Sequence, residues 1–279
     1  MMRILAPQHC AINTATLGFQ APIGQVIEAI VRHGFAGIAP WRREIEGQDV
    51  KAVAKQIRDA GLSVTSYCRS TYIPSEDVQG FNLNVASNIA ALNDAANLGA
   101  ESFVMVVGSK PDLVSARAQV KEATAIMLEH GKNIGVKISL EPLHPVYAAE
   151  RSCLTLLSEA LDICDDIEGD VASPWLGVCI DAYHVWWDPN LARDIARAGK
   201  TKRIFNFHVC DWLVPTRDVL NDRGMMGDGV IELKALRSMI EYAGYVGLVE
   251  TEIFSSENWW KKPMDETLRV IKERLATSV

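Results

Sequence analysis

The sequence predicts an α/β fold, a single (β/α)8 TIM barrel that spans residues 1–279. Short apolar runs rich in β-branched residues alternate with amphipathic helical patterns, and there are eight of each along the chain. Strict alternation of this kind predicts right-handed βαβ crossovers and a parallel sheet. The chain of 279 residues is close to the ~250 residues typical of such a barrel, and no change of composition or linker divides it.

Each predicted strand is a short apolar run bounded by polar residues or glycine. In chain order the strands cover residues 3–13, 35–40, 62–68, 101–107, 136–142, 175–181, 203–209 and 247–254. The predicted helices lie between and after them, over residues 22–33, 50–60, 77–98, 112–134, 152–167, 189–198, 232–243 and 263–276. Glycine comes directly after several of these patterns, as at Gly99 and Gly135, and helices commonly end at such a glycine. No G-x-G-x-x-G motif follows the first strand, which disfavours a dinucleotide-binding fold.

Composition and charge exclude several classes of protein. The apolar runs are far shorter than the ~20 residues that cross a bilayer, so we expect no membrane association. The net charge of −7 disfavours nucleic acid as a partner, because proteins that neutralise phosphates are usually basic. The six cysteines form no C-x-x-C motif, and the first residues lack the pattern of a secretory signal. We therefore expect reduced thiols and a cytoplasmic location.

Several strand ends carry residues that bind metal ions. In a (β/α)8 barrel the active site lies at the C-terminal ends of the strands, and four of these ends hold Glu141, Asp181, His208 and Glu252. Each interrupts an apolar run, where an unpaired charge is costly. Three carboxylates and one imidazole suit one divalent ion; Mn²⁺ is expected first, and Mg²⁺, Co²⁺ or Zn²⁺ are also compatible. Glu250, one layer deeper, is predicted to be a buried ion-pair partner.

A second group of residues near the strand ends has the character of a substrate-binding site. His184 lies three residues after Asp181. Arg223 begins a glycine-containing loop in which the backbone can approach a small polar ligand, although Arg217 in the same loop is a rival for this role. The other predicted substrate-binding residues follow further strand ends, and they are Asn13, Trp41, Arg42 and His144.

Together these strand ends resemble the xylose isomerase-like barrel superfamily, which includes sugar isomerases, sugar epimerases and inosose dehydratases. The resemblance covers nearly the whole chain. It rests on SLEP with Glu141, the D-x-x-H of Asp181 and His184, the strand-end His208, the R-x-x-x-G-x-G that begins at Arg223, and the E-I-F at Glu252. In the ketose 3-epimerases of the superfamily, the positions matching Glu141, Asp181, His208 and Glu252 bind one divalent metal, and those matching His184 and Arg223 hold the substrate.

The resemblance implies a metal-dependent isomerase or epimerase that acts on a keto-sugar or a related polyol ketone. A divalent metal would acidify the carbon-bound proton next to the carbonyl and stabilise the resulting enediolate. We expect Glu141 and Glu252 to be the catalytic pair that removes and returns this proton. An alternative is a lyase on the same scaffold, an inosose-type dehydratase or a 3-keto-glycoside β-eliminase, because the same enediolate can expel a leaving group. A DNA-repair endonuclease is disfavoured by the acidic chain, and homo-oligomerisation is left open.

Overall fold

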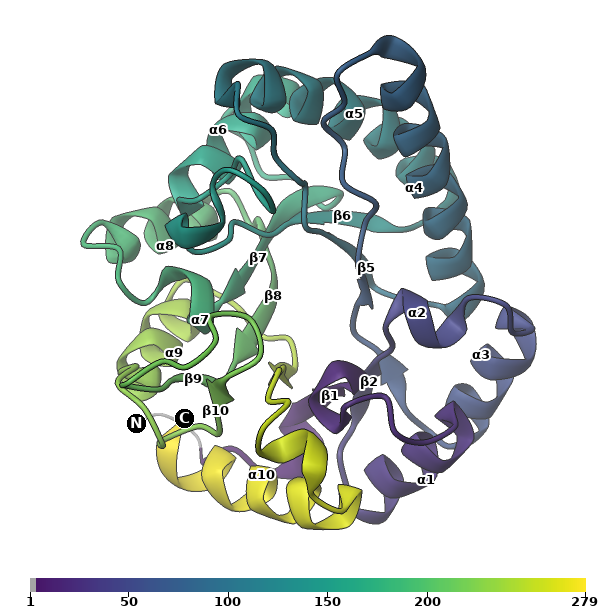
Figure 1. Ribbon diagram of the computed structural model, residues 1–279, viewed down its shortest axis with the longest axis vertical. Helices are drawn as coiled ribbons and strands as arrows, with labels where there is room; N and C mark the ends of the chain where they lie inside the picture. The colour runs from purple at the N-terminus through teal and green to yellow at the C-terminus, as the bar shows by residue number, and fades with distance from the viewer. Residues whose placement is uncertain (1–3) are drawn as a thin grey trace.

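The computed structural model describes residues 4–279, and it is a nearly closed barrel of parallel strands surrounded by helices (Figure 1). The strands are hydrogen-bonded in the order β3-β2-β1-β11-β8-β7-β6-β5-β4, and every pairing in this sheet is parallel. The two end strands of this order, β3 (Ser63–Val64) and β4 (Tyr67–Cys68), are parts of one predicted strand. The sheet therefore returns on itself, and the predicted barrel fold is confirmed.

The remaining strands of the barrel are short and almost entirely buried. They are β1 (Cys10–Asn13), β2 (Gly37–Ala39), β5 (Ser102–Met105), β6 (Lys137–Leu140), β7 (Leu176–Asp181), β8 (Ile204–Val209) and β11 (Val249–Thr251). The long helices form the outer layer, and they are α1 (Ile23–Arg32), α3 (Val50–Asp59), α4 (Val78–Leu98), α5 (Leu113–Ile134), α6 (Leu157–Glu168), α8 (Leu191–Lys200), α9 (Leu233–Tyr242) and α10 (Met264–Ser278). Over residues 4–279, none of the helices has the length and apolar character needed to cross a membrane.

Capping residues set the ends of the two longest helices. The carboxylates of Asp77 and Asp112 accept hydrogen bonds from backbone N–H groups in the first turns of α4 and α5. Gly99 and Gly135 follow these helices with φ angles of 74° and 79°, a left-handed conformation that glycine adopts without steric cost. These turns direct the chain back into β5 and β6, as the sequence predicted.

Two predicted strands differ from the structure. The strand predicted over residues 3–13 begins only at Cys10, because Pro7 starts a 3-10 turn and has no N–H to donate to a neighbouring strand. The first residue of that prediction, Arg3, lies outside the described residues. The strand predicted over residues 62–68 is divided into β3 and β4, which pair with β2 and β5 respectively.

The helix predicted over residues 152–167 begins later, at Leu157. The side chain of Glu159 accepts hydrogen bonds from the backbone N–H groups of Thr155 and Leu156, at 2.7 and 3.2 Å, which caps the helix at this point. The residues before it follow an extended path, because Ser152 forms a parallel bridge with Gly108.

Short elements that the sequence did not predict lie beyond the C-terminal ends of the strands. Two of them are helices, α2 (Arg42–Ile45) after β2 and α7 (Ala182–Val185) after β7. The third is an antiparallel hairpin after β8, made of β9 (Asp211–Trp212) and β10 (Arg223–Gly224). They surround the mouth of the barrel (Figure 1). The residues expected to perform chemistry therefore lie under a partial cover.

Candidate functional site

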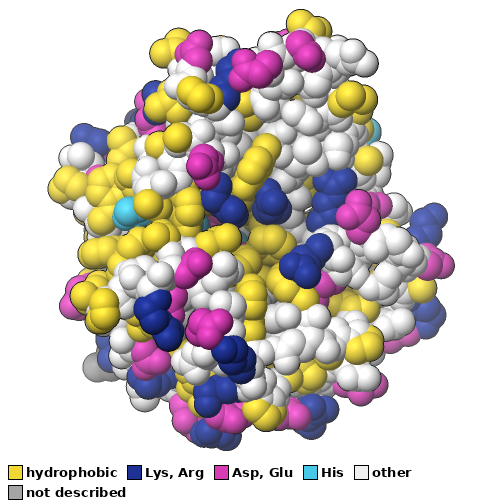
Figure 2. Space-filling model, viewed as in Figure 1, with side chains coloured by type: hydrophobic (Ala, Val, Ile, Leu, Met, Phe, Trp, Pro, Cys, Tyr) yellow, Lys and Arg dark blue, Asp and Glu magenta, His cyan; other side chains and the backbone are white. Residues whose placement is uncertain are grey.

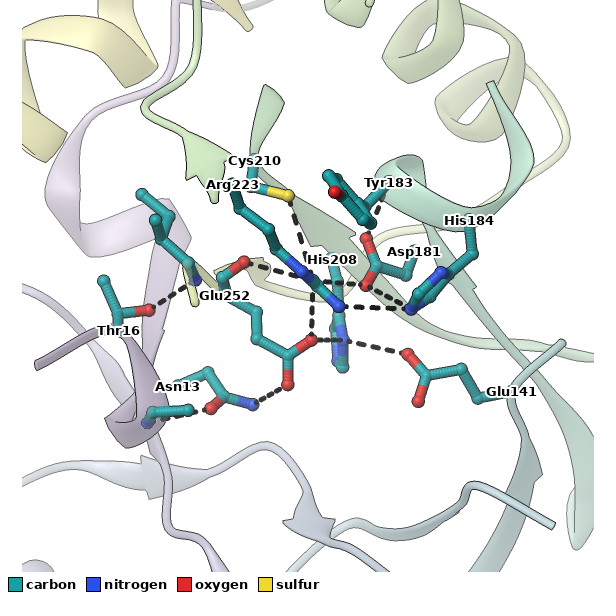
Figure 3. Close-up of polar contacts among 12 residues, drawn as sticks. Asn13, Thr16, Glu141, Asp181, Tyr183, His184, His208, Cys210, Arg223 and Glu252 are labelled. Carbon is teal, nitrogen blue, oxygen red and sulfur yellow. Dashed lines mark hydrogen bonds and ion pairs between the residues drawn. The ribbon is translucent and has the colours of Figure 1, made fainter. Parts of the chain in front are cut away.

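The four predicted metal-binding side chains meet at the C-terminal mouth of the barrel (Figure 3). Glu141 follows β6, Asp181 ends β7, His208 lies in β8 and Glu252 follows β11. One oxygen or nitrogen atom from each side chain lies within 4.8 Å of the corresponding atoms of the other three. All four side chains are buried. Residues far apart in the sequence are thus brought together by the parallel register of neighbouring strands.

The imidazole of His208 lies between two layers of carboxylates. Its Nδ1 atom is 3.6 Å from Oε1 of Glu141 and 3.6 Å from Oε2 of Glu252. Its Nε2 atom is 2.9 Å from Oε1 of Glu250, which lies deeper in the barrel. The ring therefore directs one nitrogen to the four-residue cluster and the other to the carboxylate expected to be a buried ion-pair partner.

Glu250 is fixed by a set of neutral donors. Its carboxylate accepts hydrogen bonds from Thr65 at 2.7 Å, from Ser66 at 3.1 Å and from Nδ2 of Asn13 at 3.0 Å. Nδ2 of Asn13 also donates to Oε1 of Glu252 at 2.9 Å, and its Oδ1 accepts a backbone N–H of the following turn. These contacts engage the amide of Asn13 within the protein and orient the two glutamates. A direct contact of Asn13 with substrate stays a prediction.

The chemistry of the cluster fits a divalent cation. Four buried carboxyl groups face one imidazole and one guanidinium, and buried charges are costly unless they are paired or coordinate a metal. Nδ1 of His208 is buried and has no hydrogen-bond partner among residues 4–279, although the neighbouring ligand atoms surround it. Carboxylate oxygen and imidazole nitrogen are the ligands that Mn²⁺ and Zn²⁺ accept in proteins. Cys179 can form an alternative group with Glu141 and His208.

Arg223 reaches the same cluster from β10. Its Nη1 atom lies 2.8 Å from Oδ2 of Asp181 and 3.2 Å from Oε2 of Glu252. The guanidinium carbon lies 4.4 Å from the ring centroid of Tyr183 and 5.0 Å from that of Phe254. Ion pairs and aromatic faces together hold this arginine in one position, with its charge directed at the mouth.

The loop that carries Arg223 is held by Asp211. The carboxylate of Asp211 accepts the backbone N–H of Gly227 at 2.8 Å and that of Ile231 at 3.0 Å. Arg217 points elsewhere: its Nε donates to Asp222 at 3.0 Å and its side chain is 60% exposed. Of the two rival arginines, Arg223 is the one that the structure brings to the cluster.

His184 lies beside Arg223 and is neutral at neutral pH. Its Nδ1 accepts the backbone N–H of His144 at 3.2 Å, and its Nε2 lies 3.1 Å from Nη2 of Arg223. Burial lowers the pKa of His184 to about 3, and the charge of Arg223 acts in the same direction. The ring centroids of His144 and Trp212 lie 4.7 Å apart. His144 is not among the residues that line the cavity next to Glu141, Glu252 and His184. A direct contact of His144 with substrate stays a prediction.

The two predicted catalytic glutamates differ in their acidity. Burial raises the pKa of Glu141 to about 7, although His208 acts against this rise. Burial also disfavours the charged form of Glu252, but His208 and Arg223 outweigh it and lower the pKa of that carboxyl. Before any cation binds, the site therefore holds one glutamate that is partly protonated near neutral pH and one that is ionised.

Two cavities that share lining residues lie at the mouth of the barrel. The inner cavity is lined by Glu141, Glu252 and His184 together with Trp41, Arg69 and Arg151. The outer cavity has a volume of about 730 Å³ and shares Trp41 and Arg69 with the inner one. Arg42, predicted to bind substrate, lines the outer cavity. Figure 2 shows basic side chains gathered around the central hollow of this face.

The sequence did not single out Arg151 as a residue of the site. Arg151 follows β6 by more than ten residues, in a segment without strand or helix periodicity, so its position depends on the path of the loop. Asp211 binds the backbone of the loop, a role that follows only from the hairpin geometry.

Comparison with known proteins places the chain in a family. The sequence matches the family described as xylose isomerase-like TIM barrel over residues 27–274, which is most of its length. The chain belongs to this family. The resemblance inferred from the strand-end motifs is therefore confirmed at the level of the family.

Three similar proteins match nearly the whole chain. The inosose isomerase of Bacillus velezensis is 23% identical over 94% of this chain and 93% of its own length. The crystal structure of protein SMc04130 from Sinorhizobium meliloti 1021 has a TM-score of 0.93 and 44% identity over 97% of this chain and 98% of that chain. The structure of the IOLI protein with a bound zinc atom has a TM-score of 0.81 and 19% identity over 95% of this chain and 96% of that chain.

Proposed function

We propose that this protein is a divalent-metal-dependent isomerase or epimerase that acts on a keto-sugar or a related polyol ketone. One observation carries the proposal: Glu141 and Glu252 approach Nδ1 of His208 from two different strands, each at 3.6 Å, within a buried four-ligand cluster. Such a site presents two carboxylates to a substrate bound between them. Proton removal by one carboxylate and proton return by the other is the chemistry of epimerisation and isomerisation.

Glu141, Asp181, His208 and Glu252 would hold the cation. When bound, a divalent cation polarises a substrate carbonyl and makes the neighbouring carbon-bound proton more acidic. The expectation of one divalent ion is supported by the unpartnered Nδ1 of His208, and by the zinc atom of the structurally similar IOLI protein. Mn²⁺ remains the ion proposed first, with Zn²⁺, Mg²⁺ and Co²⁺ as alternatives for the same ligands.

The protein's own groups divide the proton transfer between them. Glu252 is the proposed base, because its pKa is lowered and Asn13 and Arg223 hold its carboxylate in place. Glu141 is the proposed group that returns the proton, because it faces Nδ1 of His208 from a different strand than Glu252 does. Neutral His184 and cationic Arg223 are proposed to bind substrate oxygens and to stabilise negative charge that develops there.

The substrate class is supported by the relatives. The curated relative that matches nearly the full length of this chain is an inosose isomerase, and an inosose is a polyol ketone. A second candidate, a lyase on the same scaffold, is favoured by the outer cavity of about 730 Å³, because a glycoside bearing a leaving group needs more room than a free ketose.

Deuterium uptake tests the proposal directly. The metal-loaded protein would be incubated with ketohexoses and inososes in D₂O, and carbon-bound deuterium and product configuration would be followed by NMR. The proposal predicts exchange that falls by about 100-fold or more in Glu252→Gln and in Glu141→Gln, whereas Glu273→Gln, an exposed glutamate of α10 paired with Arg269, retains the wild-type rate. Near-wild-type turnover in Glu252→Gln would contradict the two-glutamate scheme. An α,β-unsaturated ketone formed without an epimer would identify the lyase.

A further inference from the structure

The mouth of the barrel carries an excess of unpaired arginines. Within residues 4–279, the arginines with no carboxylate oxygen within 4.0 Å are Arg42, Arg43, Arg58, Arg69 and Arg151. All of them except Arg58 line the two cavities at the mouth of the barrel. Arg58 lines a separate cavity beside α3. Unpaired guanidinium groups are thus concentrated in one place, where a ligand can reach them.

Neutral groups hold these side chains in position. Nη1 and Nη2 of Arg42 donate to the hydroxyl groups of Thr71 and Ser87, at 2.9 and 3.1 Å. The guanidinium of Arg43 lies 3.9 Å from the ring centroid of Phe19. Hydroxyl groups and aromatic rings orient a guanidinium without neutralising its charge.

The two arginines nearest the cluster are held in the same way. Arg69 lies over the ring of Tyr72 at 4.6 Å, and Arg151 lies over the ring of Tyr147 at 5.4 Å. Nε of Arg151 is buried and has no hydrogen-bond partner among the described residues. A buried donor without a partner is costly, so a ligand that supplied an acceptor here would gain binding energy.

The carboxylates facing the outer cavity do not balance this charge. Among its lining residues, Glu46 is the carboxylate, and its side chain is exposed. Asp94 lies close enough to Arg42 for the two charges to interact, but it does not line the cavity. Arg42, Arg43 and Arg69 therefore leave a net positive charge in a cavity of about 730 Å³.

We propose that the outer cavity is an anion subsite, and that the natural substrate is a keto-sugar with a carboxylate or phosphate group at the end remote from the carbonyl. The inference rests on the proposed function and narrows it from keto-sugars in general to anionic ones. A guanidinium group binds two oxygens of a carboxylate or phosphate at once. A neutral ketose or polyol has no such anionic group. Trp41 and Arg69 line both cavities, so the proposed substrate would pass these two residues on its way from the four-ligand cluster to Arg42.

Binding measurements on the metal-loaded protein test the subsite. Quenching of tryptophan fluorescence, with calorimetry as a second readout, would compare neutral D-fructose with D-fructose 6-phosphate and 5-keto-D-gluconate. Anionic ketoses are expected to bind about tenfold or more tightly than D-fructose. The phosphate and carboxylate probes distinguish the two anion types, and the tighter of the two identifies the group that the cavity accepts.

Arginine variants assign the effect to the cavity. Arg42→Gln and Arg69→Gln are each expected to weaken binding of the preferred anionic ketose by about tenfold more than binding of D-fructose. Arg58→Gln is the matched control, because it removes an unpaired arginine outside the two cavities, and it should change neither affinity. Circular dichroism would verify that each variant is folded.

The outcomes separate this inference from the proposed function. Equal affinity for neutral and anionic ketoses, or an anion effect that survives both arginine variants, would overturn the subsite, while deuterium exchange with neutral ketones would leave the isomerase proposal intact. Arginine-dependent anion binding without deuterium exchange on any ketone would support the subsite and contradict the proposed reaction.

Discussion

The Nε2 atom of His208 lies 2.9 Å from Oε1 of Glu250, while its Nδ1 atom faces the four-ligand cluster. Carboxylates placed behind metal-binding histidines fix the orientation of the ring and raise its basicity, and their loss commonly weakens metal binding by about 10–100-fold. Thr65 and Ser66 hold Glu250 in place, so the pair is rigid. We therefore propose that the deeper carboxylate supports metal binding at the site although it is not one of the four proposed ligands.

Replacement of Glu250 tests this relationship. We expect Glu250→Gln to weaken the binding of Mn²⁺ or Zn²⁺ by about 10–100-fold, because the amide removes the negative charge next to Nε2 of His208. Competition with a fluorescent chelator would measure the affinity. Glu273→Gln, an exposed glutamate on α10, is the control and should bind metal as the wild type does. Unchanged affinity in Glu250→Gln would show that the pair serves only the packing of the barrel.

Metal affinity should rise with pH between about pH 6 and 8. Burial raises the pKa of Glu141 to about 7. Burial disfavours the charged form of His208, but Cys179 and Glu250 next to the ring outweigh it and raise its pKa well above the usual range. Both groups carry protons in the metal-free protein and must lose them to act as ligands, so binding releases protons. Calorimetry in buffers of different ionisation enthalpy would count these protons, and an affinity independent of pH would contradict the assigned ligands.

Arg223 and Arg217 form a matched pair for substitution. Arg223→Lys should lower kcat/KM by about 10–100-fold, because lysine cannot reach Asp181 and Glu252 together or present a planar fork between Tyr183 and Phe254. Arg217→Lys should be nearly neutral, since that side chain is exposed. Steady-state kinetics on the substrate found by deuterium exchange would compare them. Equal effects of the two substitutions would remove Arg223 from the site.

Asp211 should matter for the loop and not for metal binding. Asp211→Ala removes the acceptor of three backbone N–H groups, from Trp212, Gly227 and Ile231, and should lower the free energy of unfolding by about 1–3 kcal/mol. Thermal and urea denaturation would measure the loss, with Asp218→Ala, an exposed turn residue in the same segment, as the comparison. Wild-type stability in Asp211→Ala would mean that other contacts hold the loop.

The alternation of apolar runs and helical patterns was sufficient to predict the barrel, because each unit carries its own local signals. The boundaries were less predictable. The helix expected from residue 152 begins at Leu157 because a side chain two residues into it, that of Glu159, caps the preceding turn. Strand 62–68 divides because β3 and β4 pair with different neighbours. The first feature depends on a local capping contact and the second on tertiary pairing, and hydrophobic periodicity encodes neither.

The candidate site was partly predictable for a similar reason. Glu141, Asp181, His208 and Glu252 stand at strand ends, and parallel register brings such ends together. Asn13 also stands at a strand end, but only the structure shows that its amide is engaged by Glu250 and Glu252. Of the unpaired arginines at the mouth, Arg42 was predicted from its place after a strand end, whereas Arg151 follows no periodic pattern and is placed only by the path of its loop.

Elemental analysis tests whether the four-ligand cluster binds a divalent metal ion. Protein purified without chelator would be analysed for Mn, Zn, Co and Mg beside Asp181→Ala, with Asp166→Ala, an exposed carboxylate of α6, as the control. We expect about one divalent ion per chain in the wild type and in the control, and loss of this ion in Asp181→Ala. A wild-type protein that binds none of these ions, even after incubation with excess Mn²⁺, Co²⁺ or Zn²⁺, would contradict the proposed metal centre and the chemistry built on it.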